Sequence, residues 1–310
     1  MNALKPLKFL AFLVAFFVGA AAVFADETHE KTIAFAQDTM ANDFRKAQVY
    51  EVRDAAARHP GIRFVYSDAK GKTSLLIRQI ERFIADKVDL IIVGTNDETA
   101  VVPVVAKAYE SGIPVIILDR GIQGEAYTTF INSDNIKIGA IGGRYIAKML
   151  EGKGTVLLFE GLQKADVTQL RSQGFLAEIA KHPGIKVIKR TGNYLRRDAI
   201  METEKLVQEG VSFDAVFSES DSMLSGVRSV LEKHGIDPRG LVTVGCDYTT
   251  EAQNAIREGR QSGSVLFPLG GYRSVEIALK IFAGEKVPKH IFIPVKLVTK
   301  ENVETVPPIF

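Results

Sequence analysis

The segment VIILDRGI, residues 115–122, places two charged side chains directly after a run of apolar residues. Val115 to Leu118 have the composition of a strand that is buried on both faces. An Asp carboxylate offers hydrogen-bond acceptors to hydroxyl groups, and an Arg guanidinium offers a planar fan of donors. Asp119 and Arg120 are therefore suited to hold a small polar ligand, although a surface ion pair at a strand end explains these two residues alone equally well.

Polar and aromatic side chains also follow other predicted strands or open the helices next to them. Ligands of open α/β sheets bind beyond the carboxyl ends of the strands, so these side chains would meet at one place. Carboxylates accept from hydroxyls, Arg donates to ring and hydroxyl oxygens, and rings cover apolar C–H faces. The set suits a small polyhydroxyl ligand held between two lobes: Asp38, Phe44, Arg45, Asp119, Arg120, Arg171, Tyr194, Asp221 and Asp247.

Each of these residues also has a simpler structural interpretation. The Asp residues can cap helix N-termini, and Asp221 and Asp247 are the most open to this interpretation. Tyr194 can be a packing residue of the core.

Motifs for other chemistries are incomplete or absent. The GKT at 71–73 lacks the glycine that a phosphate-binding loop needs five positions earlier, where Tyr66 stands. The five His residues are scattered and have no metal-ligand spacing. Asp38 and Asp119 could meet as paired carboxylates, but no nucleophile and base accompany them. We therefore expect no catalytic residue, no cofactor and no metal. Glycines at 139, 142 and 143 are interpreted as close helix packing.

Apolar strands alternate with amphipathic helices along the chain, which predicts parallel sheets covered on both faces. There are too many strands for one sheet, so we expect two α/β units that join near residues 131–135, where Ser133 or Asp134 caps the next helix. The predicted strands are 31–37, 62–67, 88–94, 114–119, 128–133, 154–160, 185–192, 214–220, 241–247 and 262–267, with an extended segment at 290–298. The predicted helices are 42–58, 74–84, 98–111, 136–150, 167–181, 197–209, 222–234, 249–258 and 271–283.

The first 25 residues have the pattern of a secretory signal peptide. Lys5 and Lys8 precede an apolar run from Phe9, and Val23-Phe24-Ala25 offers small residues at the cleavage positions, which predicts cleavage before Asp26. A permanent membrane anchor is the alternative. A spanning helix needs about 20 apolar residues, and the small residues at the end of the run favour cleavage.

Charge and cysteine content exclude further classes. Without Lys5 and Lys8, the 39 basic residues become 37, against 37 acidic residues. A nucleic-acid-binding protein would show a basic excess or patch, so nucleic acid is not expected as a partner. The single Cys246 rules out an internal disulfide and is expected to fill a small buried space.

Six segments together carry a family resemblance. The mature chain resembles the type I periplasmic sugar-binding proteins of ABC transporters, in the ribose- and galactofuranose-binding branch. The strand-end Asp-Arg pair is among the strongest marks of that branch. The segments are KTIAFAQDTMANDFRKA (31–47), SGIPVIILDRGI (111–122), INSDNIKIGAIGGRYIAKML (131–150), RSQGF (171–175), AVFSESDSM (215–223) and VTVGCD (243–247).

The resemblance implies two Rossmann-like lobes with parallel sheets, joined by a three-segment hinge. Residues 1–25 form the signal peptide, 26–133 plus 267–293 form the N-terminal lobe, and 134–266 plus 294–310 form the C-terminal lobe. The hinges are expected near Ser133-Asp134, Phe267-Pro268 and Ile293-Pro294. The resemblance also implies a periplasmic monomer that binds a sugar, closes around it and delivers it to a membrane permease.

By its motifs, the resemblance assigns ligand contacts to Asn42, Phe44, Asp119, Arg120, Arg171, Tyr194 and Asp247. Four residues depart from the ribose-binding pattern, and three of them, Asp38, Arg45 and Ser220, are still predicted to bind the ligand. Asp38 stands for a hydroxyl residue, Arg45 for a second Phe, Ser220 for an Asn and Leu266 for an amide. Arg45 matches the galactofuranose-type branch, where it is a ligand contact. These changes argue against plain ribose and favour a different sugar or a polyol.

The leading hypothesis is a sugar- or polyol-binding receptor of an ABC importer without catalytic activity. One alternative is a receptor that presents its ligand to a chemoreceptor or sensor kinase, which would use the same cleft. Another alternative is a sugar-modifying periplasmic enzyme, since the carboxylates could act in catalysis. A transcriptional repressor core shares the fold, but a signal peptide occupies the place of its DNA-binding helices.

Overall fold

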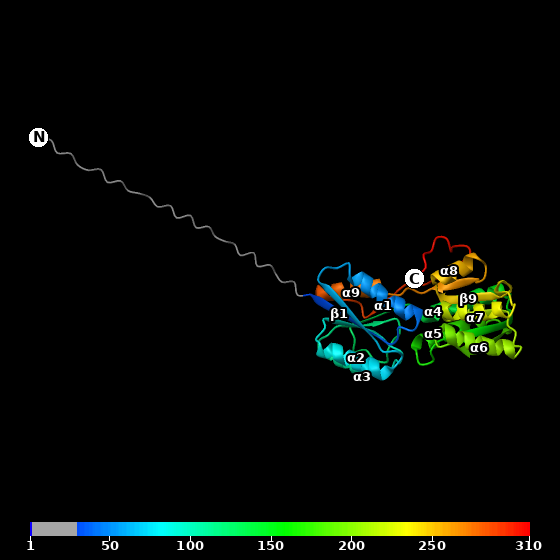
Figure 1. Ribbon diagram of the computed structural model, residues 1–310, viewed down its shortest axis with the longest axis horizontal. Helices are drawn as coiled ribbons and strands as arrows, with labels where there is room; N and C mark the ends of the chain where they lie inside the picture. Colours follow the sequence, from blue (N-terminus) through cyan, green and yellow to red (C-terminus); the bar gives the residue numbers. More distant parts are fainter. Residues whose placement is uncertain (2–29) are drawn as a thin grey trace.

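The computed structural model describes Met1 and residues 30–310, so the predicted signal peptide lies outside the described residues beyond Met1. Figure 1 shows two α/β lobes beside each other, one containing β1 and the other β9. Within the described part of the chain, no helix combines the length and apolar character needed to cross a membrane.

The first lobe is built on a parallel sheet of six strands in the order β11-β5-β4-β3-β1-β2. Apolar side chains cover both faces because each face packs against helices: α1 and α9 on one face, α2 and α3 on the other. The strands are β1 (Lys31–Gln37), β2 (Ile62–Asp68), β3 (Leu90–Gly94), β4 (Val115–Leu118), β5 (Thr129–Asn132) and β11 (His290–Phe292). The helices are α1 (Asp43–Ala56), α2 (Thr73–Ala85), α3 (Val102–Glu110) and α9 (Gly271–Phe282).

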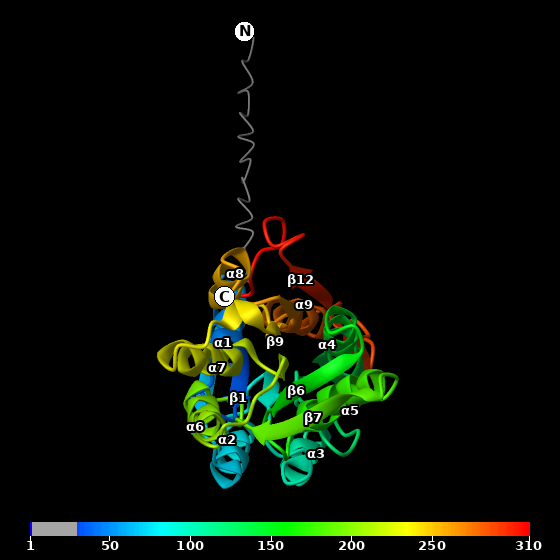
Figure 2. The ribbon, with the colours of Figure 1, turned by 90° about the vertical axis from the view of Figure 1, so that its right-hand side faces the viewer.

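The second lobe repeats this plan with the order β12-β10-β9-β8-β6-β7, and β12 runs antiparallel to β10. Figure 2 looks onto this lobe, with α5, α6 and α7 around its sheet. Its strands are β6 (Lys153–Glu160), β7 (Gly184–Thr191), β8 (Ala215–Ser218), β9 (Val242–Asp247), β10 (Gly263–Leu266) and β12 (Lys296–Thr299). Its helices are α4 (Asn135–Met149), α5 (Asp166–Ile179), α6 (Arg196–Gln208), α7 (Asp221–Lys233), α8 (Thr250–Arg257) and the short 3-10 helix η1 (Pro238–Gly240).

The chain passes between the two sheets three times. The passages lie between β5 and α4, between β10 and α9, and between β11 and β12. The extended segment predicted at 290–298 is therefore two strands, one in each sheet. Pro294 stands between them and cannot donate a ladder hydrogen bond. The lobe boundaries and hinge positions given above stay predictions.

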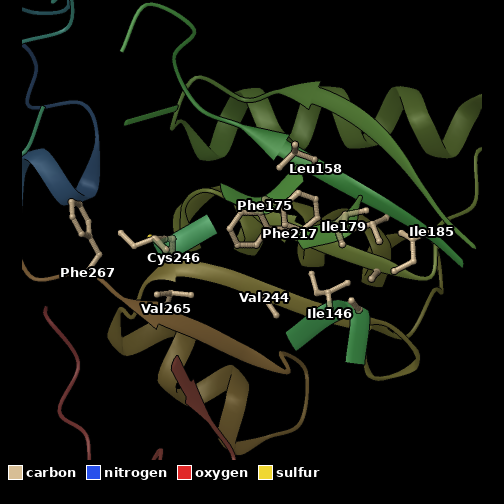
Figure 3. Close-up of a cluster of buried hydrophobic side chains, with 14 of the residues drawn as sticks. Ile146, Leu158, Phe175, Ile179, Ile185, Phe217, Val244, Cys246, Val265 and Phe267 are labelled. Carbon is tan, nitrogen blue, oxygen red and sulfur yellow. The ribbon is translucent and has the colours of Figure 1, made fainter. Parts of the chain in front are cut away.

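The core of the second lobe contains the single Cys246. Figure 3 shows it among apolar side chains, near the stacked rings of Phe175 and Phe217. Those two ring centroids lie 4.7 Å apart. Burial raises the pKa of the Cys246 thiol, so the group stays neutral, as expected for a small buried filler.

Helices α4 and α5 approach each other at glycines. A Cβ built on Gly139 would lie 1.9 Å from the backbone oxygen of Arg171, and one on Gly174 would lie 2.0 Å from the backbone oxygen of Ile136. No real Cβ tolerates such distances, so these positions admit only glycine without a shift of one helix. The interpretation of the helical glycines as close packing is confirmed. The side chain of Asp134 caps α4 by accepting from Lys137 N at 2.9 Å.

We expect Glu51→Ala to destabilise the protein through α9. The Glu51 carboxylate of α1 accepts hydrogen bonds from the backbone N–H groups of Gly271 and Tyr272. These groups stand at the start of α9, where backbone N–H groups have no partner within the helix. Loss of this cap should lower the free energy of unfolding by about 0.5–2 kcal/mol. Glu51→Gln keeps an acceptor oxygen and should lose less. Urea unfolding of the three proteins measures the difference, and equal losses for both variants would contradict the capping role.

Candidate ligand-binding site

A cavity lies between the two lobes, at the carboxyl ends of the strands. The space not filled by protein atoms there is about 280 Å³, and this figure includes space that is open to solvent. Nine of the eleven residues predicted from the sequence line it; Asp38 and Asp221 do not, and Val167 and Phe267 were missed. The lining residues are Asn42, Phe44, Arg45, Asp119, Arg120, Val167, Arg171, Tyr194, Ser220, Asp247 and Phe267. That the nine predicted residues contact a ligand stays a prediction.

On the first lobe, two Arg and two Asp residues form a buried charge network. Arg45 Nη1 pairs with Asp119 Oδ2 at 2.9 Å, and Arg120 Nη1 pairs with Asp38 Oδ2 at 3.1 Å. Arg45 Nε also lies 3.5 Å from Asp38 Oδ1. Arg45 thus both lines the cavity and pairs with Asp38.

Asp38 does not line the cavity but contacts two residues that do, Arg45 and Arg120. Its side chain is only 2% exposed, and its carboxylate contacts the two Arg residues rather than the cavity. Burial raises the pKa of Asp38, while the adjacent Arg45 and Arg120 act in the opposite direction. Burial also lowers the pKa of Arg45. The network therefore holds both guanidinium groups in fixed positions at the edge of the cavity.

Two polar atoms of the strand-end pair have no hydrogen-bond partner among the described residues. They are Asp119 Oδ1, an acceptor, and Arg120 Nε, a donor, and both atoms are buried. A buried polar group left unsatisfied costs roughly 1–3 kcal/mol. A ligand that offers both a donor and an acceptor in the cavity would remove this cost.

Three lining residues have backbone conformations that side chains rarely adopt. The φ angle is +71° at Asp119, +61° at Tyr194 and +108° at Asp247. Each stands at or just beyond the end of a strand: β4, β7 and β9 respectively. Such conformations are unfavourable by about 1–3 kcal/mol each, and they gather at functional sites when the fold enforces them. Here they turn three side chains into the cavity.

On the second lobe, Arg171 is held rigidly from several sides. Its Nε donates to Asn135 Oδ1 at 2.8 Å, and its Nη1 donates to Glu219 O at 2.7 Å. The guanidinium lies 4.5 Å from the centre of the Phe267 ring. Burial raises the pKa of the nearby Asp247 well above its usual value, with Arg171 opposing the shift. This wall therefore presents a fixed cation next to a carboxyl group that retains its proton readily.

Asp221 belongs to the interior of the second lobe. Its carboxylate accepts from Tyr248 N at 2.7 Å, Gln261 Nε2 at 2.8 Å and Ser264 Oγ at 2.6 Å. These partners lie directly after β9, just before β10 and on β10, so the hydrogen bonds hold parts of the second lobe together. Burial raises the pKa of Asp221 to about 6. Asp221 is not the N-cap of α7 either, because Ser220 occupies that position.

The residues missed by sequence reasoning are apolar. Phe267 stacks on Phe44 with ring centroids 5.0 Å apart, so the two rings join the lobes at the cavity. Its place directly after β10 was a usable signal, since the other site residues follow strands. Val167 stands in the first turn of α5, and nothing in its type distinguishes it from a core residue.

The lobes touch around the cavity through direct hydrogen bonds. Asn42 Nδ2 donates to Tyr194 O at 2.6 Å, and Ser222 Oγ donates to Asp43 Oδ2 at 2.9 Å. On another side, Gly121 N donates to Asp166 Oδ2 at 2.9 Å. These contacts describe a closed arrangement, in which access to the cavity requires the lobes to separate.

Known proteins share both the sequence pattern and the architecture. A family model described as a periplasmic binding protein domain matches residues 33–286. The ribose import binding protein of Bacillus subtilis (strain 168) is 29% identical over 275 residues, which cover 88% of each chain.

Two solved structures are also similar. An ABC transporter solute binding protein from Bacillus halodurans C-125, with bound myo-inositol, has a TM-score of 0.85 and 29% identity, covering 90% of this chain and 98% of that chain. The fructose binding periplasmic domain of a hybrid two component system has a TM-score of 0.83 and 27% identity, covering 88% and 92%.

Two α/β lobes with parallel sheets, closed over a polar cavity, have the type I periplasmic binding protein fold. The chain belongs to the periplasmic binding protein family. The predicted fold and family are confirmed. The similar proteins are binding proteins, in agreement with the prediction that this chain is not an enzyme.

Proposed function

We propose that this protein is the periplasmic receptor of an ABC importer, which captures a sugar or polyol in the cavity between its lobes. The observation that carries the proposal is the pair of buried, unpartnered atoms Asp119 Oδ1 and Arg120 Nε. A hydroxyl group is both donor and acceptor, so adjacent hydroxyls of one ligand can satisfy both atoms.

The lining of the cavity supports a single small ring or a short polyol. The rings of Phe44 and Tyr194 offer apolar faces to C–H groups. The similar proteins named above bind ribose, myo-inositol and fructose, which are all small polyhydroxyl compounds. Arg45 and Ser220 differ from the residues of the ribose-binding pattern, and these differences favour a ligand other than ribose.

Export and delivery complete the proposal. The signal peptide at residues 1–25 directs the chain across the inner membrane and is cleaved before Asp26. The mature monomer closes around its ligand, and the permease recognises the closed form. Closure brings Asp43 and Ser222 together from different lobes, so it creates a composite surface that the open form lacks.

Thermal unfolding against a panel of pentoses, hexoses, furanose sugars, polyols and sugar acids tests the proposal. Ligand at 100 times its dissociation constant stabilises the native state by roughly 2.7 kcal/mol. We expect one compound or a few related ones to raise Tm by several degrees. The sequence has no Trp, so a dye or calorimetric signal is preferable. A flat response to every compound would contradict the proposal.

A receptor that feeds a membrane sensor is the second candidate. It is favoured by the similarity to the fructose binding domain of a hybrid two component system. Both candidates use the same cavity. Co-purification of the ligand-bound protein with its permease or with a sensor kinase would distinguish them.

A further inference from the structure

Glu219 lies behind the cavity and supports two of its lining residues. It follows β8 and is fully buried, with 0% exposure. Its carboxylate Oε2 lies 3.3 Å from the Tyr194 hydroxyl, and its backbone oxygen accepts from Arg171 Nη1 at 2.7 Å. Glu219 does not line the cavity, so any effect on a ligand must pass through these neighbours.

A serine hydroxyl bridges Glu219 to a second acidic residue. Ser172 Oγ lies 2.9 Å from Glu219 Oε1 and 2.9 Å from Glu160 Oε1. A hydroxyl has one proton to donate, so it can donate to only one of the two oxygens. If both carboxyls were ionised, the other contact would bring two lone pairs together. Both contacts are satisfied when one carboxyl carries a proton.

The environment assigns that proton to Glu219. Glu160 pairs with Lys189 Nζ at 3.0 Å, which stabilises its charge. No ion pair joins Glu219 to a cation in the part of the chain that the structure describes. Burial raises the pKa of Glu219 to about 7, although hydrogen bonding to Gly161 N acts against the shift. The titratable groups around it come from β6, β7, α5, β9 and the loop before α6: Glu160, Lys189, Arg171, Cys246 and Tyr194.

We propose that Glu219 is a positioning residue that holds this shared proton, and that losing the proton rearranges the hydrogen bonds of Tyr194, so that ligand affinity changes with pH. The proposal rests on the proposed function, because it takes the cavity as the ligand site.

The protonated network leaves every contact satisfied. Glu219 Oε1–H donates to Ser172, and Ser172 donates to Glu160. Glu219 Oε2 remains free to accept from Gly161 N at 2.8 Å and from the Tyr194 hydroxyl. After ionisation, the Ser172 hydroxyl can donate to only one of two carboxylates, and Glu219 Oε2 becomes a stronger, charge-assisted acceptor for the Tyr194 hydroxyl, which also lies 2.8 Å from Thr168 Oγ1. The hydrogen bonds of Tyr194 are therefore redistributed.

Tyr194 transmits this change to the cavity. Its ring lies 5.3 Å from the Arg120 guanidinium and its backbone oxygen accepts from Asn42, so it contacts the opposite lobe twice. The pH range of the change follows from the raised pKa of Glu219. Between the ordinary carboxyl pKa of about 4.3 and about 7, folded Glu219 keeps its proton, and the network is lost as pH rises further.

Carbon NMR of the ligand-free protein tests the inference directly. With ¹³C at Glu Cδ and Tyr Cζ, we expect the Glu219 and Tyr194 signals to titrate together near pH 7. Glu219→Gln and Tyr194→Phe assign the two signals by their disappearance. Glu160→Gln should move the Glu219 midpoint to lower pH, because it removes the opposing carboxylate. A Glu219 midpoint near pH 4.5, no transition up to pH 8.5, or a Tyr194 signal that does not follow would overturn the inference.

Calorimetric titration with D-ribose, myo-inositol and D-fructose at pH 6.0 and 8.5 tests the effect on binding. We expect affinity to differ between the two pH values, with an upper limit of about tenfold per pH unit above the midpoint. Glu219→Gln should remove most of this dependence, whereas the exposed control Glu285→Gln should keep it. Affinity that is equal at both pH values would overturn the coupling. If none of the three compounds binds, the proposed function loses support, and the ligand-free spectra still decide the role of Glu219.

Discussion

Arg120→Ala should reduce ligand affinity by a factor of about 10–10² and leave the protein folded. The substitution removes the buried donor Nε from the cavity and also removes one partner of Asp38. Hydrogen bonds that involve a charged group contribute roughly 1.5–3 kcal/mol, and each 1.4 kcal/mol is tenfold in affinity. Asp38 keeps Arg45 as a partner, so the fold should survive. Calorimetric titration with the compound found in the panel measures the loss.

Two further variants sharpen this test. Arg120→Lys keeps a charge for Asp38 but loses the planar fork of donors, so its affinity should fall between those of the parent and Arg120→Ala. Arg82→Ala removes an Arg whose side chain is 81% exposed, and it should bind as the parent does. If folded Arg120→Ala kept its affinity within threefold, the assignment of the strand-end pair to ligand binding would be wrong.

Gly139→Ala should lower the free energy of unfolding by about 3 kcal/mol. The new Cβ would stand 1.9 Å from the backbone oxygen of Arg171, so α4 and α5 must move apart. Overpacking of this kind typically costs about 1–3 kcal/mol and occasionally more. Because α5 carries Arg171, the same shift should weaken ligand binding. Calorimetric unfolding should show a Tm lower by roughly 6–12 °C.

Gly240→Ala is the matched control for this prediction. A Cβ at Gly240 meets no heavy atom within 4 Å, and the backbone there does not require a positive φ. Its Tm should stay within about 1–2 °C of the parent, as expected for surface substitutions of about 0.5 kcal/mol. Equal losses in both variants would show that the close approach of α4 and α5 is not the cause.

The alternation of strands and helices was predictable because each strand is a continuous apolar run that helices cover on both faces. Composition alone did not divide the one extended segment that serves two sheets, and only the family resemblance placed a hinge inside it, near Ile293-Pro294. Residues 290–298 have strand composition throughout, and nothing local assigns β11 and β12 to different lobes. That division depends on contacts with β5 and β10, whose paired residues are thirty or more positions away along the chain.

The site was predictable to the extent that strand ends carry polar side chains. Asp119 and Arg120 follow β4 directly, and the rule for parallel sheets places them at the cavity. Asp38 and Asp221 satisfy the same rule, yet their carboxylates point into networks within one lobe. Sequence position fixes where the backbone lies, whereas the direction of a side chain depends on partners such as Arg120 or Ser264.

The first sheet is completed by residues from near the end of the chain. Strand β11 and helix α9 are synthesised after every strand of the second sheet except β12, and α9 covers one face of the first core. A growing chain that ends before residue 271 therefore exposes the apolar face that α9 will cover. Closing loops of this length is entropically slow. The first lobe can complete its fold only after strands β6 to β10 of the second lobe are present, so the folding of the two lobes is coupled through this late segment of the chain.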